Sequence, residues 1–334
     1  MCGAAACSSD WQQALDERAI ELGYSGATMA VVQDGQEIFS GATGVDRPDA
    51  GAPLNASSPM RIASVTKAFT AVVVLQLDQE GALSLDDPIT MYVPDFPGDP
   101  STTLSHLARH TSGLGDFRNH PGYWDRSEPT SALDLLQLAY GQTAESPIAG
   151  ETFEYSSANY LLLGLVIEQA SRDSWESQVR TRIVEPLDLS IRFADEDVTL
   201  VPGFDLQGVE QTDHPNARSS WSSGSLIGTA SDIARFGDAL LAGDLLDAAH
   251  MDELLDRAPL NTGHTADYGF GIATGDSAFG PYQGNRAFTP GYSASWSYRA
   301  DLGSTVAVLI PRAPYNGRAL ERAAWNHLLE QAPP

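Results

Sequence analysis

The segments with strand character lie at the two ends of this chain, and segments with helical character fill the middle. Near the start, residues 28–33 and 37–41 flank the turn Asp34-Gly35, a pattern typical of a β-hairpin. Further strand patterns occur only toward the other end, at residues 268–273, around Phe288, at 293–299 and at 304–311. Strands placed in this way predict one antiparallel sheet built from both ends of the chain.

Helical patterns surround and separate these strands. Apolar residues recur at helical spacing in residues 11–22 and 318–331, and further helical pieces cover residues 66–80, 101–110, 131–139, 157–170, 175–184 and 231–241. We therefore expect an α/β (α+β) fold in which N- and C-terminal helices flank the antiparallel sheet. The central helices form an inserted, mainly helical lobe, and a small-molecule site is expected in the cleft between the two lobes.

The same pattern sets the expected domain boundaries. The sheet lobe combines residues 10–75 with residues 228–334, and the helical lobe covers residues 76–227. Residues 1–9 precede any periodic segment, so they are expected to form a disordered terminus.

The first ten residues hold both cysteines, Cys2 and Cys7, so no structural disulfide is expected inside the fold. This stretch has neither a basic start nor an apolar run long enough for a secretory signal. A cysteine followed by Gly, Ala and Ser could be the remainder of a lipoprotein tether, and a frayed terminus is the alternative. Elsewhere the longest apolar runs, residues 71–75 and 161–167, are far shorter than the roughly 18 residues of a membrane span.

The net negative charge of the chain argues against some classes of binding partner. Its 19 basic and 44 acidic side chains give a net charge of −25, which repels phosphate backbones and anionic lipids. We therefore expect neither a nucleic-acid partner nor a membrane-surface role. Lys67 is the only lysine, and every other basic residue is an arginine. The chain thus keeps one ammonium group whose pKa moves readily on burial.

Several common catalytic motifs are absent from the sequence. There is no Gly-x-Ser-x-Gly elbow, no Gly-x4-Gly-Lys-Ser/Thr phosphate loop and no Gly-x-Gly-x-x-Gly. His106 and His110 stand four residues apart in an expected helix, but Leu107 follows His106 where a zinc peptidase has glutamate. We interpret both histidines as structural and expect neither a metal nor a cofactor.

The positive signal is Ser64, which precedes Lys67 by three residues at the start of an expected helix. This spacing places the hydroxyl and the amine on one helical face, within reach of each other. A serine hydroxyl is a weak nucleophile until a neighbour removes its proton, and a desolvated lysine can do so. An arginine could not, because it does not lose its proton. The helix N-terminus adds partial positive charge that favours an oxyanion.

Around this pair the sequence resembles the serine β-lactamase and penicillin-binding-protein superfamily. The resemblance is to the branch of class C β-lactamases, D-alanyl-D-alanine carboxypeptidases, D-aminopeptidases and related esterases. It runs from about residue 28 to residue 310. It rests on residues 61–70 (RIASVTKAFT), 81–89 (GALSLDDPI), 110–114 (HTSGL), 153–164 (FEYSSANYLLLG), 228–236 (GTASDIARF) and 288–295 (FTPGYSAS), which occur in the family's order.

The resemblance implies a role for each matching residue. Ser64 would be the acylated nucleophile and Lys67 its base, and Tyr155 would correspond to the tyrosine of the family's Tyr-x-Asn motif. Its phenol would relay protons to the leaving group and from the deacylating water. The backbone N–H groups of Ser64 and Phe288 would form the oxyanion hole. A core tyrosine in front of a buried helix is the alternative interpretation of Tyr155.

Two positions depart from the family pattern. Ser157 stands where the family has asparagine, so a shorter hydroxyl would face Lys67 and substrate; Asn159, two residues on, is interpreted as a helix residue. The family's third motif begins with Lys or His, whereas this chain has Asn285-Arg286-Ala287. Arg286 could bind a substrate carboxylate or be a solvated strand residue.

Tyr123 and Trp124 complete the candidate substrate-binding residues, as aromatic walls of the pocket, and packing against the helical lobe is the alternative interpretation of this pair. The resemblance then implies a serine hydrolase without metal or cofactor that acts on a small molecule or short peptide. A D-alanyl-D-alanine carboxypeptidase or a related peptidase or amidase comes first. The alternatives are a carboxylesterase of the same fold and a non-catalytic penicillin-binding-like module.

The family's cell-wall substrates imply a location outside the cytoplasm, as a secreted protein or a lipoprotein, with the cytoplasm as the alternative. The acyl group and the oligomeric state stay open at this point.

Overall fold

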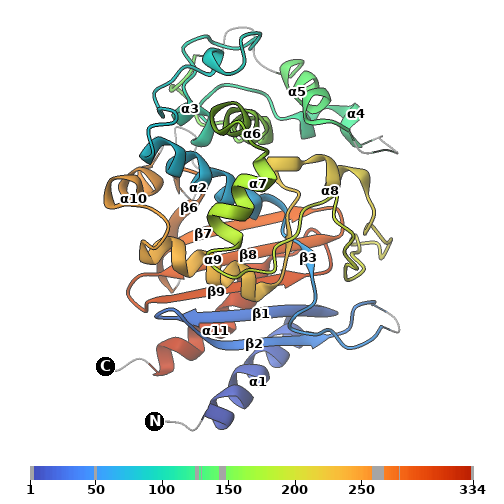
Figure 1. Cartoon of the computed structure of the whole chain (residues 1–334). Coiled ribbons are helices and arrows are strands. Elements are labelled where there is room, and N and C mark those ends of the chain that lie inside the picture. The colour runs from blue at the N-terminus through green and yellow to red at the C-terminus, as the bar shows by residue number, and fades with distance from the viewer. Residues whose placement is uncertain are drawn as a thin grey trace.

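Seven strands form one antiparallel sheet in the order β2-β1-β9-β8-β7-β6-β5 (Figure 1). The computed structural model describes residues 4–48, 51–124, 128, 130–142, 148–257, 267–277 and 279–331. The strands are β1 (Gly26–Gln33), β2 (Gln36–Gly44), β5 (Asp267–Tyr268), β6 (Ala273–Ser277), β7 (Gly280–Thr289), β8 (Tyr292–Arg299) and β9 (Ser304–Ile310). The first and last long strands are neighbours, with Thr28 opposite Leu309. The predicted α/β fold with a sheet from both chain ends is therefore confirmed.

Helices cover both faces of this sheet, which explains why β1, β8 and β9 are buried along almost their whole length. The helices α1 (Ala4–Leu22) and α11 (Gly317–Gln331) lie together on one face (Figure 1). The helix α9 (Ala230–Ala242) packs on the other face, against β1, β8 and β9. Helix α1 begins at Ala4, earlier than the predicted residue 11, so it includes residues 4–9, which we expected to be disordered.

Alternation along the strands divides the apolar side chains between two layers. Met29 and Val31 of β1 belong to the cluster with Trp11 of α1 and Trp325 of α11. Ala30 and Val32, which alternate with them, belong to a larger cluster on the opposite face. That larger cluster continues through α2 (Thr66–Gln79) into the helical lobe, so α2 is buried on nearly all sides.

The helical lobe lies on the α2 side of the sheet (Figure 1). Among the described residues of 76–227, none belongs to the seven-stranded sheet. The α-helices of this lobe and of the connection after α9 are α3 (Leu104–Ala108), α4 (Pro121–Trp124), α5 (Ala132–Tyr140), α6 (Ser157–Ser171), α7 (Trp175–Val179), α8 (Pro215–Ser219) and α10 (Ala248–Leu255). Shorter turns are η1 (Ala63–Val65), η2 (Ile89–Met91), η3 (Phe117–Asn119), η4 (Arg180–Val184) and η5 (Trp221–Ser223). No helix in the described ranges is long and apolar enough to cross a membrane.

A two-residue strand pair joins the beginning and the end of the helical segment. In it β3 (Met60–Arg61) pairs with β4 (Ile227–Gly228) outside the main sheet. The backbone continues this pairing, because Ile62 N–H donates to Leu226 O at 3.0 Å. The pair lies immediately before η1 and shortly after η5, so it fixes these two turns beside each other.

Several predicted elements differ in extent. The helix expected over residues 101–110 covers only Leu104–Ala108, and His110 lies beyond it with a left-handed φ of 57°. The strand expected over residues 268–273 is interrupted: Tyr268 ends β5, Ala273 begins β6, and the residues between them form a tight connection. In this connection Gly271 has a φ of 84°, and a Cβ atom there would lie 2.4 Å from Ala71 Cβ. Close approach to α2 therefore requires glycine and interrupts the strand.

Leu309→Ala should lower the free energy of unfolding by about 2–5 kcal/mol, because Leu309 is fully buried in β9 between sheet and helices. Denaturant unfolding measured by circular dichroism tests this. Leu133→Ala on α5 is the matched control, since Leu133 is 62% exposed and should change stability little. Equal effects of the two substitutions would contradict the assignment of β9 to the core.

Candidate active site

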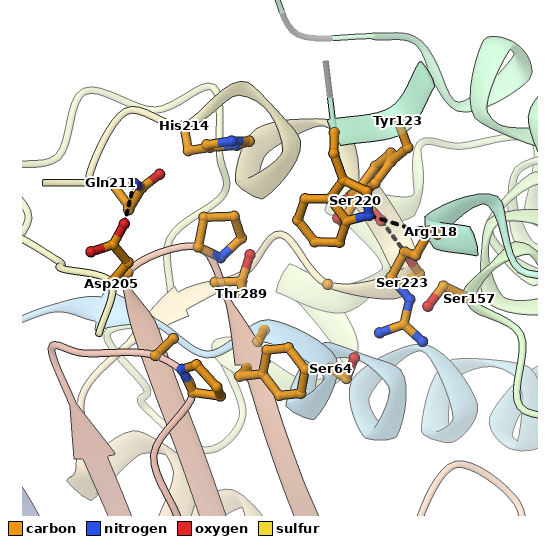
Figure 2. A pocket seen from close by; sticks show the side chains of 18 of the residues that line it. Ser64, Arg118, Tyr123, Ser157, Asp205, Gln211, His214, Ser220, Ser223 and Thr289 are labelled. Carbon is orange, nitrogen blue, oxygen red and sulfur yellow. Dashed lines mark hydrogen bonds between the residues drawn. The ribbon is translucent and has the colours of Figure 1, made fainter. Parts of the chain in front are cut away.

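A strained turn presents Ser64 at the entrance to α2. Ala63 adopts a left-handed φ of 51°, which costs a non-glycine residue on the order of 1–3 kcal/mol. The turn is held in place because Thr66 Oγ1 donates to Ala63 O at 2.7 Å and accepts from Leu226 N–H at 3.2 Å. Ser64 is only partly buried, so its hydroxyl faces the pocket in front of the helix (Figure 2).

Lys67 lies one turn farther along the same side of α2 and is fully buried. Its Nζ is 3.1 Å from Ser64 Oγ, 3.4 Å from Ser157 Oγ and 2.7 Å from Ser223 O. These three contacts come from η1, α6 and η5, so the amine of α2 lies where these segments meet. All three partners are neutral oxygens.

Burial lowers the pKa of the Lys67 ammonium from its usual range, because a charged group is disfavoured where water is excluded. Tyr155 opposes this effect, and the positive charge of Arg118 adds to it. No carboxylate forms an ion pair with Lys67 in the described part of the chain. The site therefore favours the neutral amine, which has two hydrogens to donate and one lone pair to accept a proton.

Tyr155 lies directly before α6, where Ser156 caps the helix by accepting from Ala158 N–H at 3.2 Å. Lys67 Nζ is 5.2 Å from the centre of its ring. Burial raises the pKa of the Tyr155 phenol, but Lys67, Arg118 and hydrogen bonding to Ser64 outweigh burial, so the pKa falls below its usual value. The structure thus brings Ser64, Lys67 and Tyr155 together.

Ser64 lines a cavity of about 560 Å³ (Figure 2), whereas Lys67 and Tyr155 are not among the residues that line it. Of the predicted binding residues, Tyr123, Trp124, Ser157 and Phe288 line it. Trp124 and Phe288 are 50% and 56% exposed, so they form the open aromatic rim. The far wall is more polar, with Asp205, Gln211 and His214. The cavity has the size and mixed lining of a small-molecule site.

The strand β7 passes in front of η1, and its pairing with β6 ends at Gly284. From Asn285 onward its outer edge has no strand partner among the described residues, which leaves backbone near Phe288 to face the cavity. Asn285 itself is buried, where its amide donates to Gly271 O at 3.1 Å and accepts from Ala273 N–H at 3.2 Å. Arg286 is exposed on β7, and neither residue lines the cavity.

Arg118 and the carbonyl of Ser223 are site components that sequence reasoning missed. Arg118 lines the cavity from η3, and its Cζ lies 5.2 Å from the Tyr155 ring centre. One of 19 basic residues gives no sequence signal of its own, and a backbone carbonyl gives none at all. The sequence pattern HTSGL ends only four residues before Arg118, which is the nearest available clue.

His110 and Asn159 support the site from behind. The His110 ring is buried against Tyr155 at a centroid separation of 4.3 Å, and its Nδ1 accepts from Ser156 N–H at 3.2 Å. Burial and the nearby positive charges lower its pKa well below the usual value, so the ring stays neutral. Asn159 accepts from Ser112 Oγ at 2.7 Å and faces away from the cavity. Within the described residues, no group of three or more His, Cys, Asp or Glu side chains could hold a metal ion.

Comparison with known proteins shows which family this chain is similar to. The family model described as Beta-lactamase matches residues 11–331. Penicillin-binding protein 4* of Bacillus subtilis is 25% identical, over 89% of this chain and 70% of that protein. Esterase EstB of Burkholderia gladioli is 28% identical, over 75% of this chain and 74% of the esterase.

Solved structures agree on the fold. The D-amino acid amidase of Ochrobactrum anthropi SV3, complexed with L-phenylalanine, has a TM-score of 0.85 and 22% sequence identity, with 96% of this chain and 97% of that chain covered. At this identity the likeness shows a shared fold, in which the same sheet and helical lobe recur.

Ultraviolet titration should detect the lowered pKa of Tyr155. The difference between wild type and Tyr155→Phe should contain a phenolate signal that develops below pH 10, the ordinary pKa of tyrosine. Tyr160→Phe is the control, because burial raises the pKa of Tyr160 well above that value. A Tyr155 signal that develops only above pH 10 would show that Lys67 and Arg118 do not lower its pKa.

Proposed function

The chain belongs to the β-lactamase family of hydrolases, and from this premise we propose that it cleaves its substrate through an acyl-enzyme on Ser64. The observation that carries the proposal is the 3.1 Å separation between Ser64 Oγ and the buried Lys67 Nζ. A nucleophile within hydrogen-bond reach of a group able to accept its proton is the basic requirement of this chemistry.

In the first step the neutral Lys67 amine takes the hydroxyl proton as Ser64 Oγ attacks the substrate carbonyl. The amine is oriented for this because its own hydrogens can go to Ser223 O at 2.7 Å and Ser157 Oγ at 3.4 Å. The remaining lone pair then faces Ser64. The negative charge on the carbonyl oxygen would be bound by the backbone N–H groups of Ser64 and Phe288.

Tyr155 would complete the cycle as a proton relay. Its phenol passes a proton to the leaving group when the tetrahedral intermediate collapses to the ester of Ser64. In the second step a water attacks this ester and gives a proton to the Tyr155 phenolate, while the protonated Lys67 returns its proton to Ser64 Oγ as the ester bond breaks. A pKa below the ordinary value of tyrosine suits a group that must lose and regain a proton.

For the substrate we propose a D-alanyl peptide or a related small amide, with carboxypeptidase activity first. The related penicillin-binding proteins and the amidase fold support this class. The open aromatic rim of Trp124 and Phe288 suits a small acyl group with apolar character. A cell-wall substrate would place the protein outside the cytoplasm.

A carboxylesterase of the same fold is the second candidate. Ser157 offers one hydroxyl where an asparagine amide would offer both a donor and an acceptor to a peptide group. Esters also need less protonation of the leaving group than amides do. The similarity to Esterase EstB over three quarters of the chain favours the same alternative.

Covalent labelling tests the nucleophile and its base. A fluorescent penicillin or a p-nitrophenyl ester should acylate wild type, and Ser64→Ala should abolish this. Lys67→Arg keeps the charge but cannot accept a proton, so it should slow acylation at least roughly 100-fold. An active Lys67→Arg enzyme would contradict the role of Lys67. Wild type that neither takes up label nor hydrolyses short esters would be a non-catalytic binding module.

The substrate class is decided by comparing two reactions under the same conditions. Release of D-alanine from a peptide ending in D-Ala-D-Ala should proceed with a kcat/KM above that for short p-nitrophenyl esters, relative to their uncatalysed rates. The opposite order would assign the protein to the esterases. Ser157→Asn provides an internal check, because the added amide should raise the peptide rate more than the ester rate.

A further inference from the structure

The position that the family resemblance assigns to a cation holds none in this chain. Asn285 occupies it, and its amide is committed to the backbone at Gly271 and Ala273. Arg286, the next residue, is exposed and does not line the cavity. The strand side of the site therefore supplies no positive charge beside Tyr155 within the described residues.

A positive charge reaches Tyr155 from the opposite side. Arg118 comes from η3 in the helical lobe, and its guanidinium carbon lies 5.2 Å from the Tyr155 ring centre, within the range of a cation–π contact. Figure 2 shows this side chain on the same side of the pocket as Ser64 and Ser157. Lys67 Nζ lies 5.2 Å from the same ring. The phenol thus lies close to the Arg118 guanidinium, which keeps its charge, and to the Lys67 amine, which is cationic only while it carries an added proton.

The local structure holds Arg118 firmly. Asp116, which is 3% exposed, accepts from Arg118 Nε at 2.9 Å and from Nη2 at 2.5 Å. The same carboxylate caps η3 by accepting from Arg118 N–H at 3.0 Å. Trp124 Nε1 donates to Arg118 O at 2.9 Å, which ties the aromatic rim to this turn. Asp116 binds Nε and Nη2 of Arg118, so Nη1 is not used in the hydrogen bonds to this carboxylate.

We propose that Arg118 is a positioning residue for Tyr155 and supplies, from the helical lobe, the second positive charge that the third motif lacks here. This rests on the proposed function, in which Tyr155 relays protons. A positive charge near a phenol stabilises its ionised form. The lowered pKa of Tyr155 agrees with this, because burial alone would raise it. Asp116 fixes the guanidinium in place and at the same time offsets part of its charge.

A different role for Arg118 would be direct binding of a substrate carboxylate. That role changes KM for anionic substrates and leaves neutral ones unaffected. A charge that acts through Tyr155 instead changes kcat and its pH dependence for every substrate, charged or neutral. A neutral p-nitrophenyl ester therefore distinguishes the two roles.

The experiment compares Arg118→Gln and Arg118→Lys with wild type, using kcat of the neutral ester as a function of pH. Loss of the charge raises the pKa of Tyr155, so the phenolate signal of Tyr155 in the ultraviolet titration should move to higher pH by about one unit in Arg118→Gln. The rising limb of kcat that reflects the phenolate accepting a proton from the deacylating water should move with it. At the pH values of the rising limb, kcat of Arg118→Gln should be roughly 10-fold lower than that of wild type, with KM nearly unchanged. Arg118→Lys keeps the charge and should restore most of the original profile.

Arg18→Gln is the matched control. Arg18 also pairs with a carboxylate, Glu21 at 2.7 Å, but lies on α1 on the far face of the sheet, so its removal should leave the profile unchanged. An unshifted limb in Arg118→Gln, or an effect on KM alone, would overturn the proposal. Failure of the proposed function is a separate result, because wild type would then take up no label at Ser64.

Discussion

The site depends on burying one amine without a carboxylate partner. Removing an ammonium from water is costly, and a nearby carboxylate would repay that cost while keeping the group protonated. Among the described residues Lys67 instead forms hydrogen bonds with the oxygens of Ser64, Ser157 and Ser223, and no carboxylate forms an ion pair with it. The protein thus stabilises the neutral amine, the form that can act as a base. The burial of α2 between the sheet and α6 is what keeps water away from it.

Segments of both the sheet lobe and the helical lobe surround Lys67 and Ser64. Ser64 lies in η1 and Lys67 in the first turn of α2. Tyr155 and Ser157 lie just before and at the start of α6, and Ser223 lies in η5. Arg118 reaches Tyr155 from a further segment, η3. The proposed oxyanion position depends on the outer edge of β7, which has no strand partner in the described residues beyond Gly284, where its pairing with Ala273 of β6 ends. The cavity therefore forms at the meeting point of segments that are distant in sequence.

The sequence allowed the sheet, its covering helices and the neighbourhood of Ser64 to be predicted, because periodic burial and the spacing of Ser64 and Lys67 are local properties. Gly271 shows where local patterns fail, since its turn is required by contact with α2 and not by its neighbours in sequence. Asn285 was assigned to the pocket by alignment, whereas its hydrogen bonds turn it toward the backbone of β6 and the preceding turn. Arg118 could not be selected because cation–π proximity to Tyr155 arises only from the tertiary fold. The domain boundaries and catalytic roles stay predictions.

The small strand pair between Met60–Arg61 and Ile227–Gly228 has a consequence for how activity appears during folding. It closes a loop that contains the whole helical segment, and bringing such distant residues together carries a loop-closure entropy that grows with loop length. Until this closure occurs, Ser223 O cannot reach Lys67 and the turn at Ala63 lacks its Leu226 anchor. A chain with a formed sheet and formed helices but an open pair would remain inactive. Under the proposed mechanism, recovery of activity on refolding therefore requires this non-local closure and not the formation of the sheet and helices alone.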